Sequence, residues 1–127
     1  MVIRMKGFAT SPGDPYYDGL AYVYCTDESG YCLSLCRMPD CELVEVMVRD
    51  QINHKTREVA VELRRHELRI TLSPGAAAHL ERFTEYTVSL AVIEVELHDL
   101  GAALSVIFEG GRRGRYDSRL DRLGDHG

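Results

Sequence analysis

Residues 43–72 constrain the fold of this chain more than any other stretch. They read LVEVMVRDQINHKTREVAVELRRHELRITL, in which three runs alternate apolar and charged side chains. Alternation with a period of two is typical of strands that have one buried face and one solvated face. Because the gaps between the runs are short enough only for hairpins, the pattern predicts a three-stranded antiparallel meander.

The register of this meander follows from its two predicted turns. A turn at residues 53–56 places Val48 opposite Val61, and a turn at residues 65–66 places Val61 opposite Ile70. These pairs put apolar side chains on the same face throughout, so the two turns agree with one sheet. The opposite, solvated face then carries charges of both signs, contributed by Glu45, Glu62, Arg64, Glu67 and Arg69.

The remaining patterns predict a single α+β domain. Ser73-Pro74 is a typical helix start, with Ser as the N-cap and Pro at the first helical position. Apolar residues at helical spacing predict a second helix over residues 94–108, packed on one face of the sheet. Further strands are predicted at residues 2–9, 19–25, 31–37 and 85–92. We therefore expect a mainly antiparallel sheet with a short helix and a C-terminal helix over residues 1–110, followed by a flexible arginine-rich tail over residues 111–127.

Charge and hydropathy limit the classes of partner. The net charge is −5 and the pI is about 5.5, which argues against nonspecific nucleic-acid binding, because neutralising phosphates requires clustered Lys and Arg. The same charge is compatible with binding a basic protein. No apolar run approaches the roughly 20 residues of a membrane span. The N-terminal segment is too short and too polar for a signal peptide, so we expect a cytoplasmic protein.

Four cysteines, Cys25, Cys32, Cys36 and Cys41, raise the possibility of a zinc site. Structural zinc sites usually contain close pairs such as C-x2-C, and this sequence has none. The predicted strands also direct Cys25 and the cysteines of the next strand to opposite faces. We therefore expect reduced, half-buried thiols and neither a metal nor another cofactor.

Groups for catalysis are not assembled by any recognisable pattern. The chain lacks the G-x-S-x-G nucleophile elbow, and its only glycine-rich run with arginines, at residues 110–114, follows a helix and does not open one. His98 and Asp99 are adjacent on the predicted helix, so their side chains point about 100° apart. No combination of nucleophile, base and orienting group results, and we expect a protein that is not an enzyme.

The order of elements resembles a known family. The segments YCLSLCR, VMVRDQ, VAVELRRHELRITL, GAAAHL, EYTVSLAV and LGAALSVIF follow one another between residues 19 and 110. In this order they resemble the immunity proteins of bacterial polymorphic toxin systems, in particular the tenth immunity family. The residues that carry the resemblance are Leu33, Arg37, Gln51, Leu68, Leu72, Ala77, Leu80, Leu104, Ile107 and Phe108.

The resemblance implies a non-enzymatic inhibitor that binds and neutralises a cognate toxin domain in the cytoplasm. The acidic loops Asp14–Asp18 and Asp27–Glu28 would favour a basic toxin. Two other classes stay open: a structural or homodimeric assembly module joined through a sheet edge or the solvated face, and a small enzyme that uses the cysteines or His98. For the toxin-binding hypothesis, the candidate partner-binding residues are Glu45, Arg49, Asp50, Gln51, Glu58 and Glu62.

Overall fold

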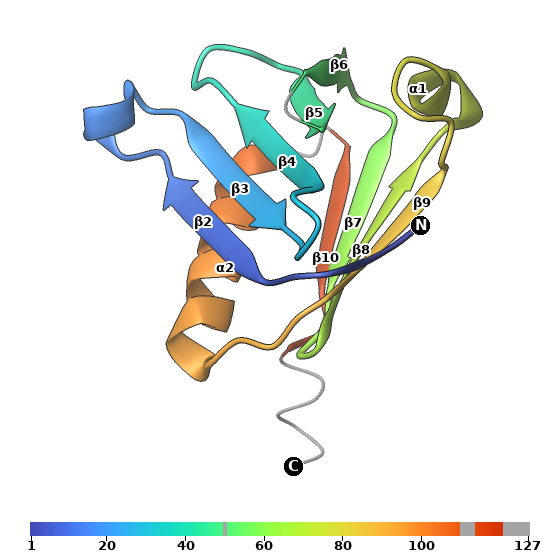
Figure 1. The fold of residues 1–127 in the computed structure, drawn as a ribbon. Helices are drawn as coiled ribbons and strands as arrows, with labels where there is room; N and C mark the ends of the chain where they lie inside the picture. The colour runs from blue at the N-terminus through green and yellow to red at the C-terminus, as the bar shows by residue number, and fades with distance from the viewer. Residues whose placement is uncertain (50, 110–113, 121–127) are drawn as a thin grey trace.

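The chain folds into two five-stranded sheets and two α-helices (Figure 1). A computed structural model describes residues 1–49, 51–109 and 114–120. The mixed sheet has the strand order β1 (Val2–Arg4), β9 (Glu85–Ser89), β8 (Glu67–Leu72), β7 (Val59–Leu63) and β10 (Arg115–Ser118). The antiparallel sheet has the order β2 (Gly7–Pro12), β3 (Ala21–Thr26), β4 (Cys32–Arg37), β5 (Val44–Val48) and β6 (Ile52–Thr56). The expected α+β architecture is therefore confirmed.

The two sheets are joined along one side by continuous backbone. The strand predicted over residues 2–9 is divided between them, because the chain leaves β1 at Met5 and enters β2 after Lys6. At this corner the Met5 N–H donates to the Ser89 carbonyl (3.1 Å) and the Lys6 N–H donates to the Thr26 carbonyl (2.7 Å). From this corner the sheets diverge, and their inner faces enclose the core (Figure 1).

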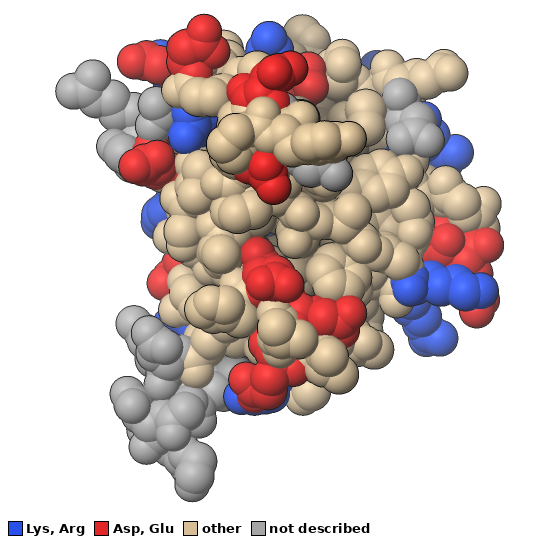
Figure 2. Space-filling view, turned by 90° about the vertical axis from the view of Figure 1, so that its left-hand side faces the viewer, with Lys and Arg blue, Asp and Glu red and all other residues tan. Residues whose placement is uncertain are grey.

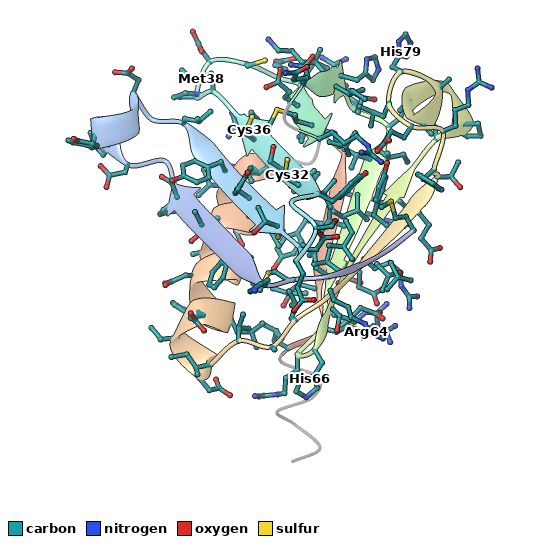
Figure 3. The ribbon with its side chains drawn as sticks, viewed as in Figure 1. Cys32, Cys36, Met38, Arg64, His66 and His79 are labelled. Carbon is teal, nitrogen blue, oxygen red and sulfur yellow. The ribbon has the colours of Figure 1, made fainter. Side chains whose placement is uncertain are left out.

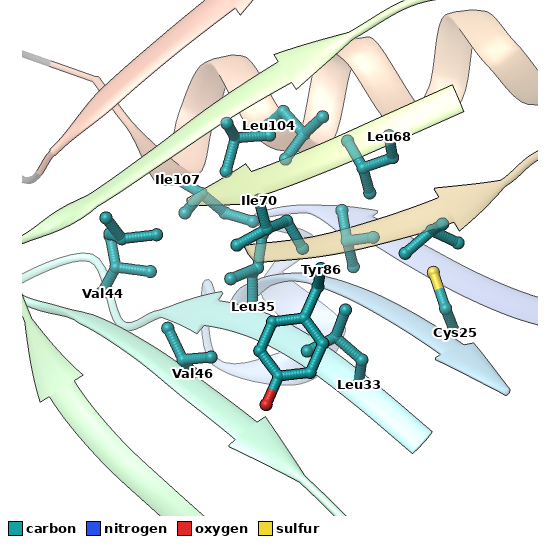
Figure 4. Packing of buried hydrophobic residues seen from close by; sticks show 14 of the residues in the cluster. Cys25, Leu33, Leu35, Val44, Val46, Leu68, Ile70, Tyr86, Leu104 and Ile107 are labelled. Carbon is teal, nitrogen blue, oxygen red and sulfur yellow. The ribbon is translucent and has the colours of Figure 1, made fainter. Parts of the chain in front are cut away.

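The longer helix, α2 (Glu94–Ile107), closes one side of the core. It lies against β2 and β3 and also reaches β10. Its apolar face is buried as the sequence predicted, with Leu100, Leu104 and Ile107 fully inaccessible to solvent. Figure 4 shows Leu104 and Ile107 packed with Ile70 of the mixed sheet and Leu35 of the antiparallel sheet.

Both helices have a capping contact at their start, and the one at Ser73 was predicted from the sequence. In α1 (Pro74–Ala78), the Ser73 Oγ accepts a hydrogen bond from the Ala76 N–H (3.1 Å). At the start of α2, the Glu96 carboxylate accepts one from the Ile93 N–H (2.9 Å). No helix in the described residues is long and apolar enough to cross a bilayer.

Of the two hairpins predicted in the meander, the first is wrong. Residues 53–56, predicted as a turn, belong to the strand β6, and Val48 pairs with Ile52 instead of Val61. The tight turn comes earlier, where Arg49 adopts a left-handed backbone conformation (φ 57°). The strand β6 was not predicted because most side chains in its sequence, INHKT, are polar and because it lies at a sheet edge. The chain then crosses to the other sheet, so β5 and β7 are not neighbours.

The second predicted hairpin is confirmed. Val61 pairs with Ile70 and Glu62 pairs with Arg69, as the alternation required. The turn at residues 65–66 is closed by a hydrogen bond from the Arg64 N–H to the Glu67 carbonyl (2.8 Å). Solvated charges therefore occupy the outer face of β7 and β8, whereas Glu45, predicted beside Arg64, lies in the other sheet.

Part of the predicted flexible tail is a strand. Within residues 111–127, β10 pairs in parallel with β7, and the Tyr116 ring stacks on Phe108 with 6.3 Å between centroids. Gly114 allows this approach: its φ is +113°, and a Cβ there would lie 2.4 Å from the Val59 carbonyl oxygen. The predicted tail therefore contributes an edge strand to the domain, while residues 111–113 and 121–127 lie outside the described part of the chain.

Candidate partner-binding surfaces

The six predicted partner-binding residues do not form one surface. They were expected on the solvated face of a single meander, but the structure distributes them over two sheets. Asp50 lies outside the described residues. Of the others, Glu45, Arg49 and Gln51 belong to β5 and the turn after it, Glu58 belongs to the link between the sheets, and Glu62 belongs to β7.

Two of these carboxylates have local partners. Glu45 lies opposite Lys55 on the outer face of the antiparallel sheet and accepts a hydrogen bond from the Cys36 thiol (3.4 Å). Glu58 accepts a hydrogen bond from the Ser73 hydroxyl (2.9 Å), next to the N-cap of α1. These contacts support the fold, and because both donors are neutral, each carboxylate keeps its negative charge.

Glu62 lies in a charged network on the outer face of the mixed sheet. Its carboxylate accepts a hydrogen bond from Arg64 and lies 3.5 Å from Arg119. The hydrogen bond from Arg64 lowers the pKa of Glu62 from its ordinary value, although burial opposes this shift. A groove of about 420 Å³ crosses this face between β7, β8 and β10, but both acidic and basic side chains line it. This surface therefore has no single charge to offer a ligand.

Arg49 belongs to a cluster that connects the two sheets. Its Nε donates to the Glu81 carboxylate (2.6 Å), and its guanidinium lies 5.0 Å from the centroid of the Tyr31 ring. The Tyr31 hydroxyl donates to the same carboxylate (2.6 Å). Burial would raise the pKa of Glu81, but the hydrogen bonds from Tyr31 and Arg49 together lower it. Glu81 thus connects the α1–β9 loop, which belongs to the mixed sheet, with the antiparallel sheet. Local sequence patterns do not predict this contact, because its residues are far apart in the sequence.

Arg37 was singled out by the resemblance, and the structure gives it a role inside the fold. The residue is 5% exposed and donates hydrogen bonds to five backbone carbonyls. Two of these end the helix α2, at Val106 (2.8 Å) and Ile107 (2.9 Å). A buried cation at a helix C-terminus interacts favourably with the helix dipole and satisfies carbonyls that have no intrahelical donor. Through these hydrogen bonds, Arg37 therefore connects the C-terminal end of α2 with the loop after β4.

One side of the molecule is acidic because of how basic residues are distributed along the chain. Neither residues 7–36 nor residues 83–109 contain a Lys or Arg. These two stretches fold against each other, since α2 packs on β2 and β3. Figure 2 views the side that carries η1 (Pro15–Tyr17), β2 and α2, and shows acidic groups across its centre with basic groups only toward its edges.

The acidic side combines exposed carboxylates with exposed apolar side chains. Asp14 and Asp18 flank η1 and are exposed, as is Asp99 on α2. Tyr16 is 86% exposed and Val95 is 59% exposed. The Asp14–Asp18 loop was named from the sequence, whereas the contribution of α2 was missed because no local pattern brings that helix beside the loop.

The four cysteines are free thiols. Burial raises the pKa of Cys25 to about 12 and is also the largest cause that raises the pKa of Cys36 to about 12, so both stay protonated near neutral pH. Figure 3 shows Cys32 and Cys36 along β4, well away from the labelled histidines. Among the residues that the structure describes, no group of three or more His, Cys, Asp or Glu side chains could hold a metal ion.

Comparison with known proteins does not place the chain in a family. No family model, no curated protein and no solved structure matches it. Function must therefore be argued from the surfaces of the protein and from the resemblance in the order of its elements.

Proposed function

We propose that this protein is an immunity protein that binds a cognate bacterial toxin domain and neutralises it by non-enzymatic protein–protein inhibition. The observation that carries the proposal is the acidic side, built from two stretches of chain that contain no Lys or Arg. The resemblance of the element order to immunity proteins supports the same function.

The chemistry of the acidic side favours a basic partner. Like-signed carboxylates spread over one side attract an oppositely charged protein within roughly 10 Å at 0.1 M salt and accelerate its association. The exposed aromatic and aliphatic groups, Tyr16 and Val95, provide the apolar contact that holds a complex together after encounter. A toxin that acts on nucleic acid or another polyanion would present such a basic surface around its active site.

Growth of cells that express the toxin tests this function. The proposal predicts a toxin gene next to the gene for this protein. The toxin domain that it encodes is expressed alone, with the wild-type protein, or with a charge-reversal variant. The wild-type protein should restore growth, and the double variant Asp14→Lys/Asp99→Lys should not. Glu85→Lys is the matched control: Glu85 belongs to the second stretch, but it is exposed on β9 of the mixed sheet, away from η1 and from the strands β2 and β3 on which α2 packs. Absence of rescue by the wild-type protein would contradict the proposal.

An assembly module is the second candidate function. The outer face of the mixed sheet is uncovered by any described element, and its alternating charges could pair with those of a second copy. Mass measurement by light scattering at micromolar concentration separates the two functions. A doubled mass, with no effect on toxin-expressing cells, would support assembly, and a monomer would exclude it.

A further inference from the structure

The two sheets also meet on the side away from the β1–β2 corner, where the edge strand β6 faces α1. We call this contact, formed by residues 52–56 and 74–79, the seam. In the described part of the chain, no backbone hydrogen bond joins β6 to α1. The nearest backbone bond runs from the Ser73 N–H to the Glu58 carbonyl (3.2 Å), beyond the end of β6. Side chains alone therefore close the seam.

A pair of stacked imidazoles lies across the seam. His54, on the inner side of β6, and His79, at the C-cap of α1, have ring centroids 4.1 Å apart and an angle of 7° between their planes. Such close face-to-face contact is favourable for neutral or singly charged rings and unfavourable for two imidazolium ions. The geometry makes the seam sensitive to the charge of the pair.

The surrounding charges do not compensate for two protonated rings. Glu58, from the link after β6, is the carboxylate that favours a protonated His54, and its single negative charge can balance at most one of the two rings. Lys55 points to the other face of β6, opposite Glu45. Glu81, which follows α1, is already held by Tyr31 and Arg49.

The electrostatic balance at His54 agrees with this geometry. Burial is the largest cause that lowers the pKa of His54, and His79 lowers it further, while Glu58 has the opposite effect. The folded protein therefore binds a proton at His54 less readily than the unfolded chain does. The contribution of the neutral ring to stability is complete above the ordinary histidine pKa of about 6.5 and is lost as the pH falls below it.

We propose that the His54–His79 stack is a pH-sensitive closure of the seam between β6 and α1. At neutral pH the stacked rings hold the edge strand against the helix. When the medium becomes acidic, protonation of both rings separates them, and the seam opens while the β1–β2 corner, the link at residues 57–58 and the Glu81 cluster keep the sheets joined. This inference stands on the contact itself and does not depend on the proposed function.

Titration of the full-length protein by NMR tests the proposal. Stacked rings shift each other's proton signals, so the ring signals of His54 and His79 should lose these shifts together as the pH is lowered from 7.5 to 5. The amide signals of β6 and α1 should move with the same midpoint, below the ordinary value of about 6.5. Each unit by which the midpoint is lowered corresponds to about a tenfold weaker affinity of the folded protein for that proton.

Two variants separate the stack from general acid sensitivity. In His79→Gln the remaining His54 ring should titrate closer to its ordinary value, and the loss of stability between pH 7.5 and 5.5 should become smaller than in the wild type. His98→Gln, at an exposed position on α2, is the matched control and should leave both readouts unchanged. If the His54 ring titrates at its ordinary value in the wild type, with no movement of the seam amides, the proposal is overturned.

Discussion

Replacing Arg37 by methionine should destabilise this protein more than any surface substitution. Methionine keeps an unbranched apolar stem of similar length but removes every hydrogen-bond donor of the guanidinium. Five backbone carbonyls lose the hydrogen bond from Arg37, among them those of Val106 and Ile107 at the end of α2. The carbonyls of Met38 and Val106 keep a backbone donor, whereas within the described residues that of Ile107 depended on Arg37. The site is closed to solvent, since Arg37 is 5% exposed, so water cannot replace all of these bonds.

The magnitude follows from the burial of the charge. A hydrogen bond to a charged group contributes about 1.5–3 kcal/mol, but five bonds from one side chain are not additive, because the guanidinium also pays for its own desolvation. A buried carbonyl that loses its donor costs about 1–3 kcal/mol, and loss of the guanidinium also removes its desolvation cost, so we expect Arg37→Met to lower the free energy of unfolding by about 2–5 kcal/mol. A domain of this size has a free energy of unfolding of about 5–15 kcal/mol, so the variant should remain measurable.

Urea unfolding followed by circular dichroism provides the assay. Arg57→Met is the matched control, because the side chain of Arg57 is 55% exposed and pairs with an equally exposed Glu42. That substitution should change the free energy of unfolding by less than about 1 kcal/mol. If Arg37→Met loses no more than the control does, the helix end does not depend on Arg37 and the reasoning is refuted.

Two further predictions concern the strand β10 and the charged network beside it. Gly114→Ala should lower the free energy of unfolding by about 1–3 kcal/mol, since a Cβ there collides with the Val59 carbonyl at positive φ. Gly30→Ala, also at positive φ but in open space, should cost less; equal losses in urea unfolding would argue against the docked strand. The lowered pKa of Glu62 means that its pairing with Arg64 stabilises the fold above the ordinary Glu pKa of about 4.3, and that this stabilisation is lost as the pH falls through the lower folded value. Glu62→Gln should therefore flatten the acid limb of the stability profile, and an unchanged limb would contradict this assignment.

Local periodicity was sufficient for much of the fold. The helix α2 and the hairpin of β7 and β8 follow from apolar spacing, because their buried faces alternate with solvated ones without interruption. The strands β6 and β10 were missed for the opposite reason: both are short, polar edge strands that bury few apolar side chains. Edge strands contribute little to the core and so carry a weak sequence signal.

The candidate surfaces were less predictable than the fold. The division of the chain between two sheets separated Glu45 from Glu62, and nothing in the sequence marks the crossing at residues 57–58. The acidic side and the Glu81 cluster depend on contacts between segments far apart in the chain. The composition gives the net negative charge of the chain. The position of part of this charge on one side of the molecule follows only from the packing of α2 on β2 and β3.

The affinity of the protein for the toxin domain that the proposal predicts in the neighbouring gene tests the central claim most directly. Isothermal titration calorimetry would compare the wild type, Asp14→Lys/Asp99→Lys and the control Glu85→Lys. We expect the wild type and the control to bind alike, and the double variant to bind at least about tenfold more weakly, equivalent to about 1.4 kcal/mol. Equal affinity of all three proteins would show that the acidic side is not the interface, and the absence of any binding by the wild type would contradict the proposed function.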